Sequence, residues 1–454
     1  MSLNAAIDWE IRQDGSDLNG GGYKRTAGTT DYSQQAAAQL ALTDLACASN
    51  TTLTSATGGF TAAMVGNVIQ IASGTNALAG FYEITGYTNT NTVTIDRTCA
   101  TGGNMTNGVG KVGGALASLG KAAGCGYVGG NRFFIKYSAT PYAIDNTDVN
   151  TANGPASFGT AGAYNNVLFV VGYDSTREAF NTDTNRPTLR VADSGVATIT
   201  VINLGTNYQT VQNIIVDGNG KTAIKGFSAA ARNSFWRCKA IGCTNVGFMQ
   251  GVFVVASLCE ADTCSVGFNG GCVGCSAHGC TSHGFSVGTA GVIACLSYGN
   301  GGAGFSGSGQ RLNCIAYGNT DDGFTDDGGY HLPCVNCISE GNTGKGFDWS
   351  HSGVAMLNCA TYNNTGGAYN NGTQINCVTG TVGSFFTNAA GGDFTLNNTE
   401  NCGALLRAAG FPGTFLNGNV GYSDIGLFQH EDAGGGGYTY GDEDAAKVLT
   451  TAAG

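Results

Sequence analysis

Hydrophobic and polar positions alternate around a series of cysteines in the second half of the chain. Two residues before each cysteine the side chain is mostly apolar, and one residue before it mostly polar or small, as at Leu312, Asn313 and Cys314. Alternation with a period of two is typical of a strand with one buried face. Glycine and asparagine follow each segment and indicate tight turns. The pattern therefore predicts many short strands joined by turns.

These strands belong to a repeat of about 20 residues, in which an aromatic residue usually follows each cysteine after nine or ten positions. A unit this short cannot bury its own apolar face, so copies must stack, and identical positions then lie above one another. We predict an all-β fold, a right-handed parallel β-helix over residues 116–395. Its structural columns are Cys238, Cys259, Cys275, Cys295, Cys314, Cys337, Cys359 and Cys377, and Phe248, Phe268, Phe285, Phe305, Phe324 and Phe347.

A further column lies five residues after the leading cysteines. It begins with Cys243, Cys264 and Cys280 and then changes to asparagine. Stacked asparagine side chains can hydrogen-bond to their copies above and below, as in amide ladders. Such bonds also satisfy backbone groups at a buried turn. We predict a structural ladder made by Asn300, Asn319, Asn342 and Asn364.

The composition excludes several classes of protein. Glycine provides 75 of 454 residues, but only 5 prolines and the lack of a Gly-X-Y period exclude collagen. A hydrophobic share of 42% with 11% charged residues argues against a disordered chain. The net charge of −11 and the lack of a Lys/Arg run predict no nucleic-acid partner. Apolar runs are too short to span a bilayer, so we expect no membrane insertion.

The 17 cysteines could in principle bind metal or form disulfides. The N-terminus has no basic start followed by an apolar core, so we expect no secretion signal and no disulfide framework. Stacked cysteines would lie ~4.8 Å apart, which a disulfide tolerates, but in-register side chains point the same way. The C-x-x-C pairs at 272–275 and 334–337 would lie three coils, ~14 Å, apart, too far to share a zinc ion. We expect free thiols, no metal and no cofactor.

Carboxylates gather late in the repeat and raise the question of catalysis. Asp326 and Asp348 follow the last two phenylalanines of the column on adjacent coils, and Glu340 lies between them in sequence. Paired acids ~5–9.5 Å apart serve glycoside hydrolysis, whereas a lyase would also need a base, and only Arg311 and Lys345 are near. The alternative is that acids here are ordinary turn residues. The acids considered are Asp321, Asp322, Asp326, Asp327, Glu340 and Asp348.

An outward row lies three residues after each leading cysteine. Because tyrosine is amphipathic and common at interfaces, Tyr298, Tyr317, Glu340 and Tyr362 are candidates for binding a protein partner or a glycan. The alternative is ordinary β-propensity on a solvent face. The row consists of Ile241, Asp262, His278, Tyr298, Tyr317, Glu340 and Tyr362.

The coils "GNTDDGF" and "GNTGKGF", each after an apolar strand, resemble those of the pectate-lyase-like superfamily of right-handed parallel β-helix proteins. The resemblance covers 205–390 well and 125–205 less well. The flanks "WEIRQDGSDLNGGGYK", "DFTL" and "DIGLFQH" resemble β-helix proteins of tailed bacteriophages, in which "DIGLFQH" forms a final strand. This organisation implies a capping or attachment module at 1–115, the β-helix at 116–395, a capping segment at 396–432 and a flexible glycine-rich tail at 433–454.

The resemblance implies a structural virion protein of a tailed phage, such as a tail fibre, a tailspike or a capsid decoration, rather than an enzyme. It would assemble in the host cytoplasm, contact other virion proteins and remain on the virion. The resemblance leaves open whether the protein forms a homotrimer and whether it binds a host surface glycan. One alternative is a tailspike enzyme, a hydrolase or lyase that degrades a polysaccharide. The other alternative is a bacterial surface adhesin.

Overall fold

The computed structural model describes residues 3, 5–145, 147–159, 162–179, 184–192, 199–326, 328, 332–407, 409–410 and 424–428. The chain divides into two compact units, Met1–Cys238 and Lys239–Gly454. Within the described ranges, no helix combines the length and hydrophobicity needed to cross a bilayer. The predicted tail, 433–454, lies outside the described residues.

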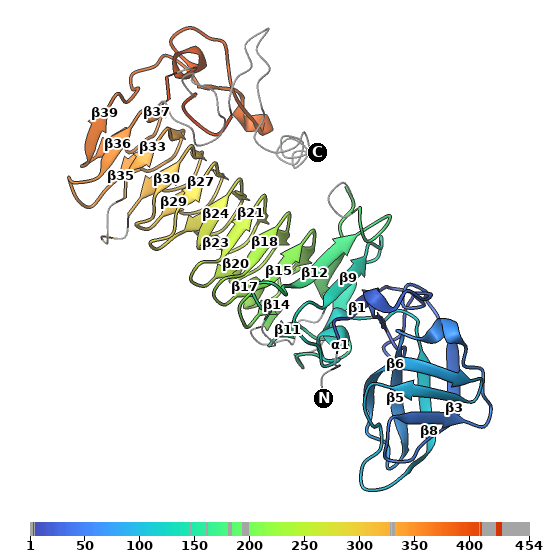
Figure 1. Ribbon diagram of the computed structural model, residues 1–454. Coiled ribbons are helices and arrows are strands. Elements are labelled where there is room, and N and C mark those ends of the chain that lie inside the picture. Colours follow the sequence, from blue (N-terminus) through green and yellow to red (C-terminus); the bar gives the residue numbers. More distant parts are fainter. Residues whose placement is uncertain are drawn as a thin grey trace. The chain divides into compact units, whose positions relative to one another are not determined.

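In the second unit, each full coil contributes one strand to each of three parallel sheets (Figure 1). Neighbouring strands pair in register, so that equivalent residues of successive coils lie side by side. The predicted parallel β-helix is therefore confirmed.

The strands of the second unit are divided among the three sheets as follows. The first sheet contains β21 (Val255–Ser257), β24 (Gly271–Val273), β27 (Val292–Ile293), β30 (Arg311–Leu312), β33 (Cys334–Val335), β36 (Ala355–Leu357) and β39 (Thr373–Ile375). The second contains β19 (Lys239–Ile241), β22 (Glu260–Asp262), β25 (Ser276–His278), β28 (Leu296–Tyr298), β31 (Ile315–Tyr317), β34 (Ile338–Glu340) and β37 (Ala360–Tyr362). The third contains β20 (Val246–Gln250), β23 (Val266–Asn269), β26 (Phe285–Ser286), β29 (Phe305–Ser306), β32 (Phe324–Thr325), β35 (Phe347–Asp348) and β38 (Tyr369–Asn370).

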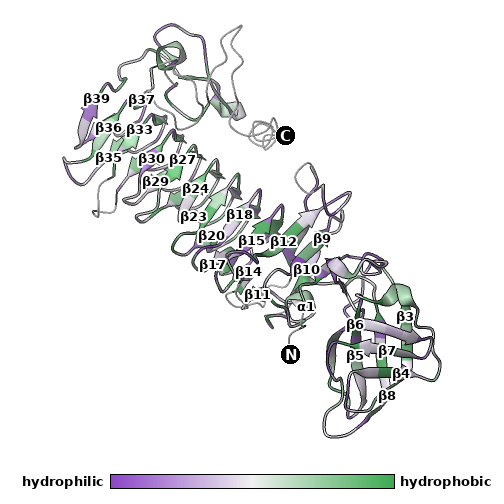
Figure 2. Cartoon of the chain, viewed as in Figure 1, coloured by the Kyte–Doolittle hydropathy of each residue, from purple (hydrophilic) through white to green (hydrophobic). Residues whose placement is uncertain are grey.

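The phenylalanines of the third sheet form a continuous stack in the interior. Neighbouring rings lie nearly parallel, with centroids 4.9 Å apart between Phe305 and Phe324 and 4.7 Å apart between Phe285 and Phe305. All six phenylalanines of the predicted column are fully buried. Tyr369 continues the stack on the last coil. In Figure 2 many of these strands are green, the colour of hydrophobic residues, as expected for strands that line a shared core.

Each leading cysteine lies at the corner between the first and second sheets. The residue before it has a left-handed backbone, with φ of 54° at Asn313, and this conformation ends the strand. The Cys314 thiol donates to the carbonyls of Leu312 at 3.3 Å and Val292 at 3.6 Å, one in its own coil and one in the preceding coil. The predicted alternation differs on several coils, because the more deeply buried residue of the first sheet lies three positions before the cysteine, as Ala256 does before Cys259. All 17 cysteines are free thiols, and every one except the half-buried Cys377 is buried.

The asparagine column forms a hydrogen-bonded ladder at the next corner. The side-chain amide of Asn300 donates to Asn319 Oδ1 at 2.9 Å, that of Asn319 to Asn342 Oδ1 at 2.8 Å, and that of Asn342 to Asn364 Oδ1 at 2.8 Å. The backbone N–H groups of the same three donors point to the same three oxygens. At one end, the Cys280 N–H donates to Asn300 Oδ1 at 2.9 Å, where the column changes from thiol to amide.

The first unit shows the same three-sheet pattern. Its first sheet contains β2 (Gly22–Tyr23), β1 (Asp8–Ile11), β9 (Arg132–Lys136), β12 (Leu168–Tyr173), β15 (Gln209–Gln212) and β18 (Ser234–Trp236). Its second contains β10 (Tyr142–Ile144), β13 (Thr188–Val191) and β16 (Ile215–Asp217), and its third contains β11 (Ala156–Phe158), β14 (Ile199–Leu204) and β17 (Ile224–Ala229).

A closed antiparallel barrel with its own apolar core lies between β2 and β9 in sequence. Because β1 pairs parallel with β9, the predicted module 1–115 contains both this barrel and the first parallel strand of the solenoid. A short helix, α1 (Leu119–Ala123), follows the barrel, and the Ser118 side chain accepts a hydrogen bond from the Lys121 N–H at its start. The barrel contains β3 (Leu40–Cys47), β4 (Thr52–Ser55), β5 (Val68–Thr75), β6 (Gly80–Asn89), β7 (Thr92–Ile95) and β8 (Met105–Val112), with the 3-10 helices η1 (Arg25–Ala27) and η2 (Ala62–Met64) nearby in sequence.

After the last coil, a capping segment packs on the outer face of the second sheet. Its strands β40 (Phe386–Asn388) and β41 (Asp393–Leu396) pair antiparallel across η3 (Ala389–Gly391), and η4 (Gly403–Leu406) follows. The segment therefore begins before the predicted boundary at residue 396. The described part of the expected final strand, 424–428, forms bends rather than a strand, yet its Ile425 is buried in the same apolar cluster.

Candidate functional site

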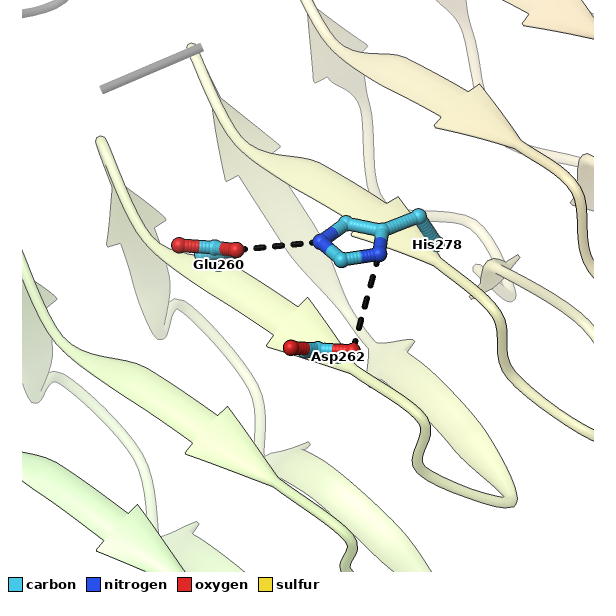
Figure 3. Close-up of side chains that lie close together, drawn as sticks. All are labelled: Glu260, Asp262 and His278. Atoms are coloured by element: carbon cyan, nitrogen blue, oxygen red, sulfur yellow. Dashed lines mark hydrogen bonds and ion pairs between the residues drawn. The ribbon is translucent and has the colours of Figure 1, made fainter. Parts of the chain in front are cut away.

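A cluster of four charged or ionisable side chains lies on the outer face of the second sheet, on β19, β22 and β25. Glu260 and Asp262 flank the buried Ala261, and side chains two apart share one face of a strand. The pairing register places Lys239 beside Glu260 and His278 beside Asp262. Figure 3 shows the His278 ring between the two carboxylates, with one ring nitrogen toward each. Regular stacking of coils therefore assembles the cluster from residues far apart in sequence.

The contacts within this cluster are short. His278 Nε2 lies 3.0 Å from Glu260 Oε1, and His278 Nδ1 lies 3.6 Å from Asp262 Oδ1. Lys239 Nζ lies 2.8 Å from Glu260 Oε1 and 3.3 Å from Asp262 Oδ2. The Glu260 side chain is 6% exposed and that of Asp262 is 24% exposed, so the cluster is partly open on the Asp262 side. The imidazole also stacks on the Tyr298 ring, with centroids 4.9 Å apart.

Opposing effects set the charge state of Glu260. Burial alone would raise the pKa of this carboxyl, but the hydrogen bond with His278 and the positive charge of Lys239 lower it below its ordinary value. Glu260 is therefore held as a carboxylate. Two acids, an imidazole and an ammonium group in contact can bind a cation or exchange protons with a ligand.

Comparison with solved structures finds several proteins that are similar to this chain. A pectate lyase aligns with a TM-score of 0.50 at 16% identity, over 70% of this chain and 92% of its own. A rhamnogalacturonan lyase aligns with a TM-score of 0.48 at 14% identity, over 68% and 92%. A protein of Geobacillus virus E2 aligns with a TM-score of 0.24 at 9% identity, over 54% and 52%. Neither a protein-family model nor a curated protein sequence matches the chain.

The chain has the pectate-lyase-like right-handed parallel β-helix fold. At these identities the likeness to solved structures concerns the fold alone. The activity of the β-helix must therefore be argued from its own side chains.

The row of tyrosines lies on the same face of the β-helix as the charged cluster, but it is not an open surface. Phe394 packs on Tyr298 at 5.2 Å and on Tyr317 at 5.5 Å between ring centroids, and Phe385 packs on Tyr362 at 6.1 Å. This corrects the expectation of a solvent-facing row, because the outward apolar residues of β28, β31, β34 and β37 attract the chain's own capping segment. Binding of a partner or glycan by these tyrosines stays a prediction.

The acids considered for catalysis that the structure describes make local contacts of their own or face solvent. Glu340 is buried and accepts a hydrogen bond from the Phe385 N–H at 3.0 Å. Asp348 Oδ1 accepts from Asn370 at 2.6 Å, and Lys345 Nζ lies 3.3 Å away. Asp326 Oδ1 accepts from the Ser350 N–H at 3.1 Å on the next coil. Asp322 likewise receives the Lys345 N–H and Asp321 is exposed, while Asp327 lies outside the described residues.

Lys239 and Glu260 were not identified from the sequence. They belong to a second outward column, one residue after each leading cysteine, which changes to the apolar Leu296, Ile315 and Ile338 in later coils. Strand register places this column beside the outward row that includes Asp262 and His278. The sequence signal for the charged cluster is therefore the pair of adjacent outward columns, and the apolar part of the second column marks the surface that the capping segment covers.

Replacing Glu340 with Gln should stabilise the β-helix increasingly as pH rises. Burial raises the pKa of Glu340 above its ordinary value, with partial compensation by hydrogen bonds from Ser384 and the Phe385 N–H. The stability that Glu340 contributes is therefore fully present below the pKa of its carboxyl in the unfolded protein. It is lost as pH rises through the pKa of the same carboxyl in the folded protein. Glutamine keeps an acceptor for Phe385 without charge. Urea unfolding between about pH 4 and 8 measures the difference in free energy of unfolding.

The matched control for this experiment is Glu400→Gln, at an exposed position. That variant should follow the parent protein across the same pH range. If the stability difference between Glu340→Gln and the parent does not grow with pH, the ionised Glu340 carboxylate does not destabilise the folded protein. That result would contradict the assignment of a buried carboxylate beneath the capping segment.

Proposed function

We propose that this chain is a structural virion protein of a tailed bacteriophage, a β-helical fibre, spike or capsid decoration that serves assembly or surface attachment. The observation that carries the proposal is the docking of the capping segment on the outer face of the second sheet. The tyrosines and Glu340, which could have formed a substrate-binding face, hold the chain's own segment there. A solenoid with one outer face covered in this way is suited to a rigid, durable shaft.

The local roles of the acids support the same proposal. Asp326, Asp348 and Asp322 accept hydrogen bonds that fix turns or bridge neighbouring coils. Such contacts stabilise the stacking of coils. The sequence resemblance of both flanks to phage β-helix proteins gives the proposal its biological setting, with other virion proteins as partners and a homotrimer or a host glycan as further expectations.

The charged cluster favours a second candidate, a polysaccharide-processing enzyme. Glu260, His278 and Lys239 include groups that can act as acid and base, and Asp262 leaves the cluster partly open to solvent. Proteins with this fold include a pectate lyase. This candidate predicts that the purified chain shortens acidic or neutral bacterial polysaccharides and that His278→Gln abolishes the activity.

The location of the protein on particles tests the leading proposal. Antibodies against the purified chain should decorate purified particles of the phage that encodes it, and mass spectrometry of those particles should detect it in stoichiometric amounts. Particles from a deletion of the gene are the control and should lose the label. The same protein should leave host capsule and lipopolysaccharide uncut. Absence from particles would overturn the proposal, and polysaccharide cleavage lost in His278→Gln would establish the enzyme instead.

A further inference from the structure

We propose that Glu260, Asp262 and His278 form a binding site for a divalent transition metal ion of the zinc class. The donor atoms of the three side chains all lie within 4.8 Å of one another. An imidazole with two carboxylates suits zinc, cobalt or nickel, whereas calcium and magnesium prefer oxygen ligands alone. This inference is independent of the proposed virion role.

A positively charged side chain of the protein, Lys239, already lies at the site. The Lys239 ammonium contacts both carboxylates, at 2.8 Å from Glu260 and 3.3 Å from Asp262. The Glu260 side chain is only 6% exposed, so its carboxylate depends on cationic or hydrogen-bonding partners rather than on water. A divalent ion that displaces the Lys239 ammonium would neutralise both carboxylates.

The ligands are held by the rigid part of the fold. Glu260 and Asp262 lie on β22 and His278 on the neighbouring β25, in a register fixed by parallel pairing. Stacking on Tyr298, which itself packs against Phe394, fixes the plane of the imidazole ring. Ligands on strands with fixed orientations lose little freedom on binding. The side-chain exposure of 24% at Asp262 and 15% at His278 leaves access for the ion and for water as a further ligand.

A metal in this position would link two adjacent coils of the β-helix on their outer face. It would complement the interior phenylalanine stack and the asparagine ladder, which connect coils from inside. Ions that bind only the folded state raise stability by mass action. The expected consequence is a rise in melting temperature with zinc that depends on His278.

Cobalt titration of the full-length protein, kept reduced with a phosphine, tests the site. Cobalt bound by nitrogen and oxygen gives weak visible bands, whereas binding to any of the 17 thiols gives a strong sulfur-to-cobalt band in the near ultraviolet. We expect visible bands alone. Removing one ligand in His278→Gln should weaken binding about tenfold or more. Lys239→Met should strengthen binding, because it removes the competing ammonium.

The control variant is His351→Gln, which alters an exposed histidine far from the cluster in sequence and should bind cobalt like the parent. Circular dichroism establishes that each variant is folded, and Asp262→Asn replaces His278→Gln if the latter does not fold. Three results would overturn the proposal: no binding by either the parent or Lys239→Met, binding that His278→Gln and Asp262→Asn leave unchanged, or a sulfur-to-cobalt band as the response.

Discussion

Replacing Phe305 with Ala should lower the free energy of unfolding by about 3–5 kcal/mol. The Phe305 side chain is fully buried and stacks between Phe285 and Phe324, with ring centroids 4.7 and 4.9 Å away. Truncation removes apolar contact on both sides of the ring. Neighbouring coils cannot collapse into the space, because strand pairing fixes their separation at ~4.8 Å. A cavity and two uncovered ring faces remain.

Urea unfolding followed by circular dichroism measures this loss, with Phe253→Ala as the matched control. Phe253 is 78% exposed, so its truncation should change stability by less than about 0.5 kcal/mol. Because coils contact mainly their neighbours, Phe305→Ala should also broaden the transition or separate it into two. Equal effects of the two substitutions would show that the interior stack does not dominate the stability of the second unit.

The columns of the β-helix could be predicted from sequence because stacking converts a repeat in the chain into contact in space. Once Phe305 and Phe324 are recognised as equivalent, their proximity follows from the coil period alone. The same argument applies to Asn300 and Asn319. The left-handed backbone at Asn313 does not follow from the repeat, since an asparagine there fits either an alternating strand or a turn.

Contacts that do not follow the period could not be predicted in this way. Docking of Phe394 against Tyr298 joins segments almost a hundred residues apart that share no repeat. Arg311 is another example, because the paired positions on neighbouring coils, from Ala256 to Met356, otherwise hold alanine, cysteine, valine and methionine. Its guanidinium is buried inside the β-helix, donates to the Thr325 carbonyl at 2.8 Å and lies over the Trp349 ring. A pattern of hydrophobic positions assigns such an arginine to the surface.

The candidate site illustrates the same limit on outward positions. Asp262 and His278 lie in one outward row of the sequence pattern, in which the tyrosines are the more conspicuous residues. The contact with Glu260 and Lys239 depends on both outward columns of the second sheet and on side-chain orientation. Outward columns vary in composition along the solenoid because each coil can meet a different neighbour. Which outward side chains come into contact can be stated only when the register of adjacent coils is known.

Replacing Asn319 with Ala should strongly destabilise the β-helix, because Asn319 is an interior member of the amide ladder. Asn319 Oδ1 accepts both the side-chain amide and the backbone N–H of Asn300, and Asn319 Nδ2 donates to Asn342 Oδ1. Truncation leaves the Asn300 backbone N–H without its acceptor. It also removes one partner from the Asn300 side-chain amide, which keeps Ser297 Oγ at 3.0 Å, and one from Asn342 Oδ1. Since each unsatisfied buried group costs about 1–3 kcal/mol, the expected loss is about 2–5 kcal/mol in the free energy of unfolding.

Asn269→Ala, at an exposed position of the third sheet, is the matched control for Asn319→Ala and should be nearly neutral. Hydrogen exchange gives a second readout, because the backbone N–H of Asn300 loses its acceptor and should exchange faster in Asn319→Ala. Slow exchange at Asn300 together with parent-like stability would mean that water or a shifted backbone replaces the ladder. The combined result expected here, low stability with local loss of protection, would establish that asparagine recurs at this corner to satisfy buried backbone groups.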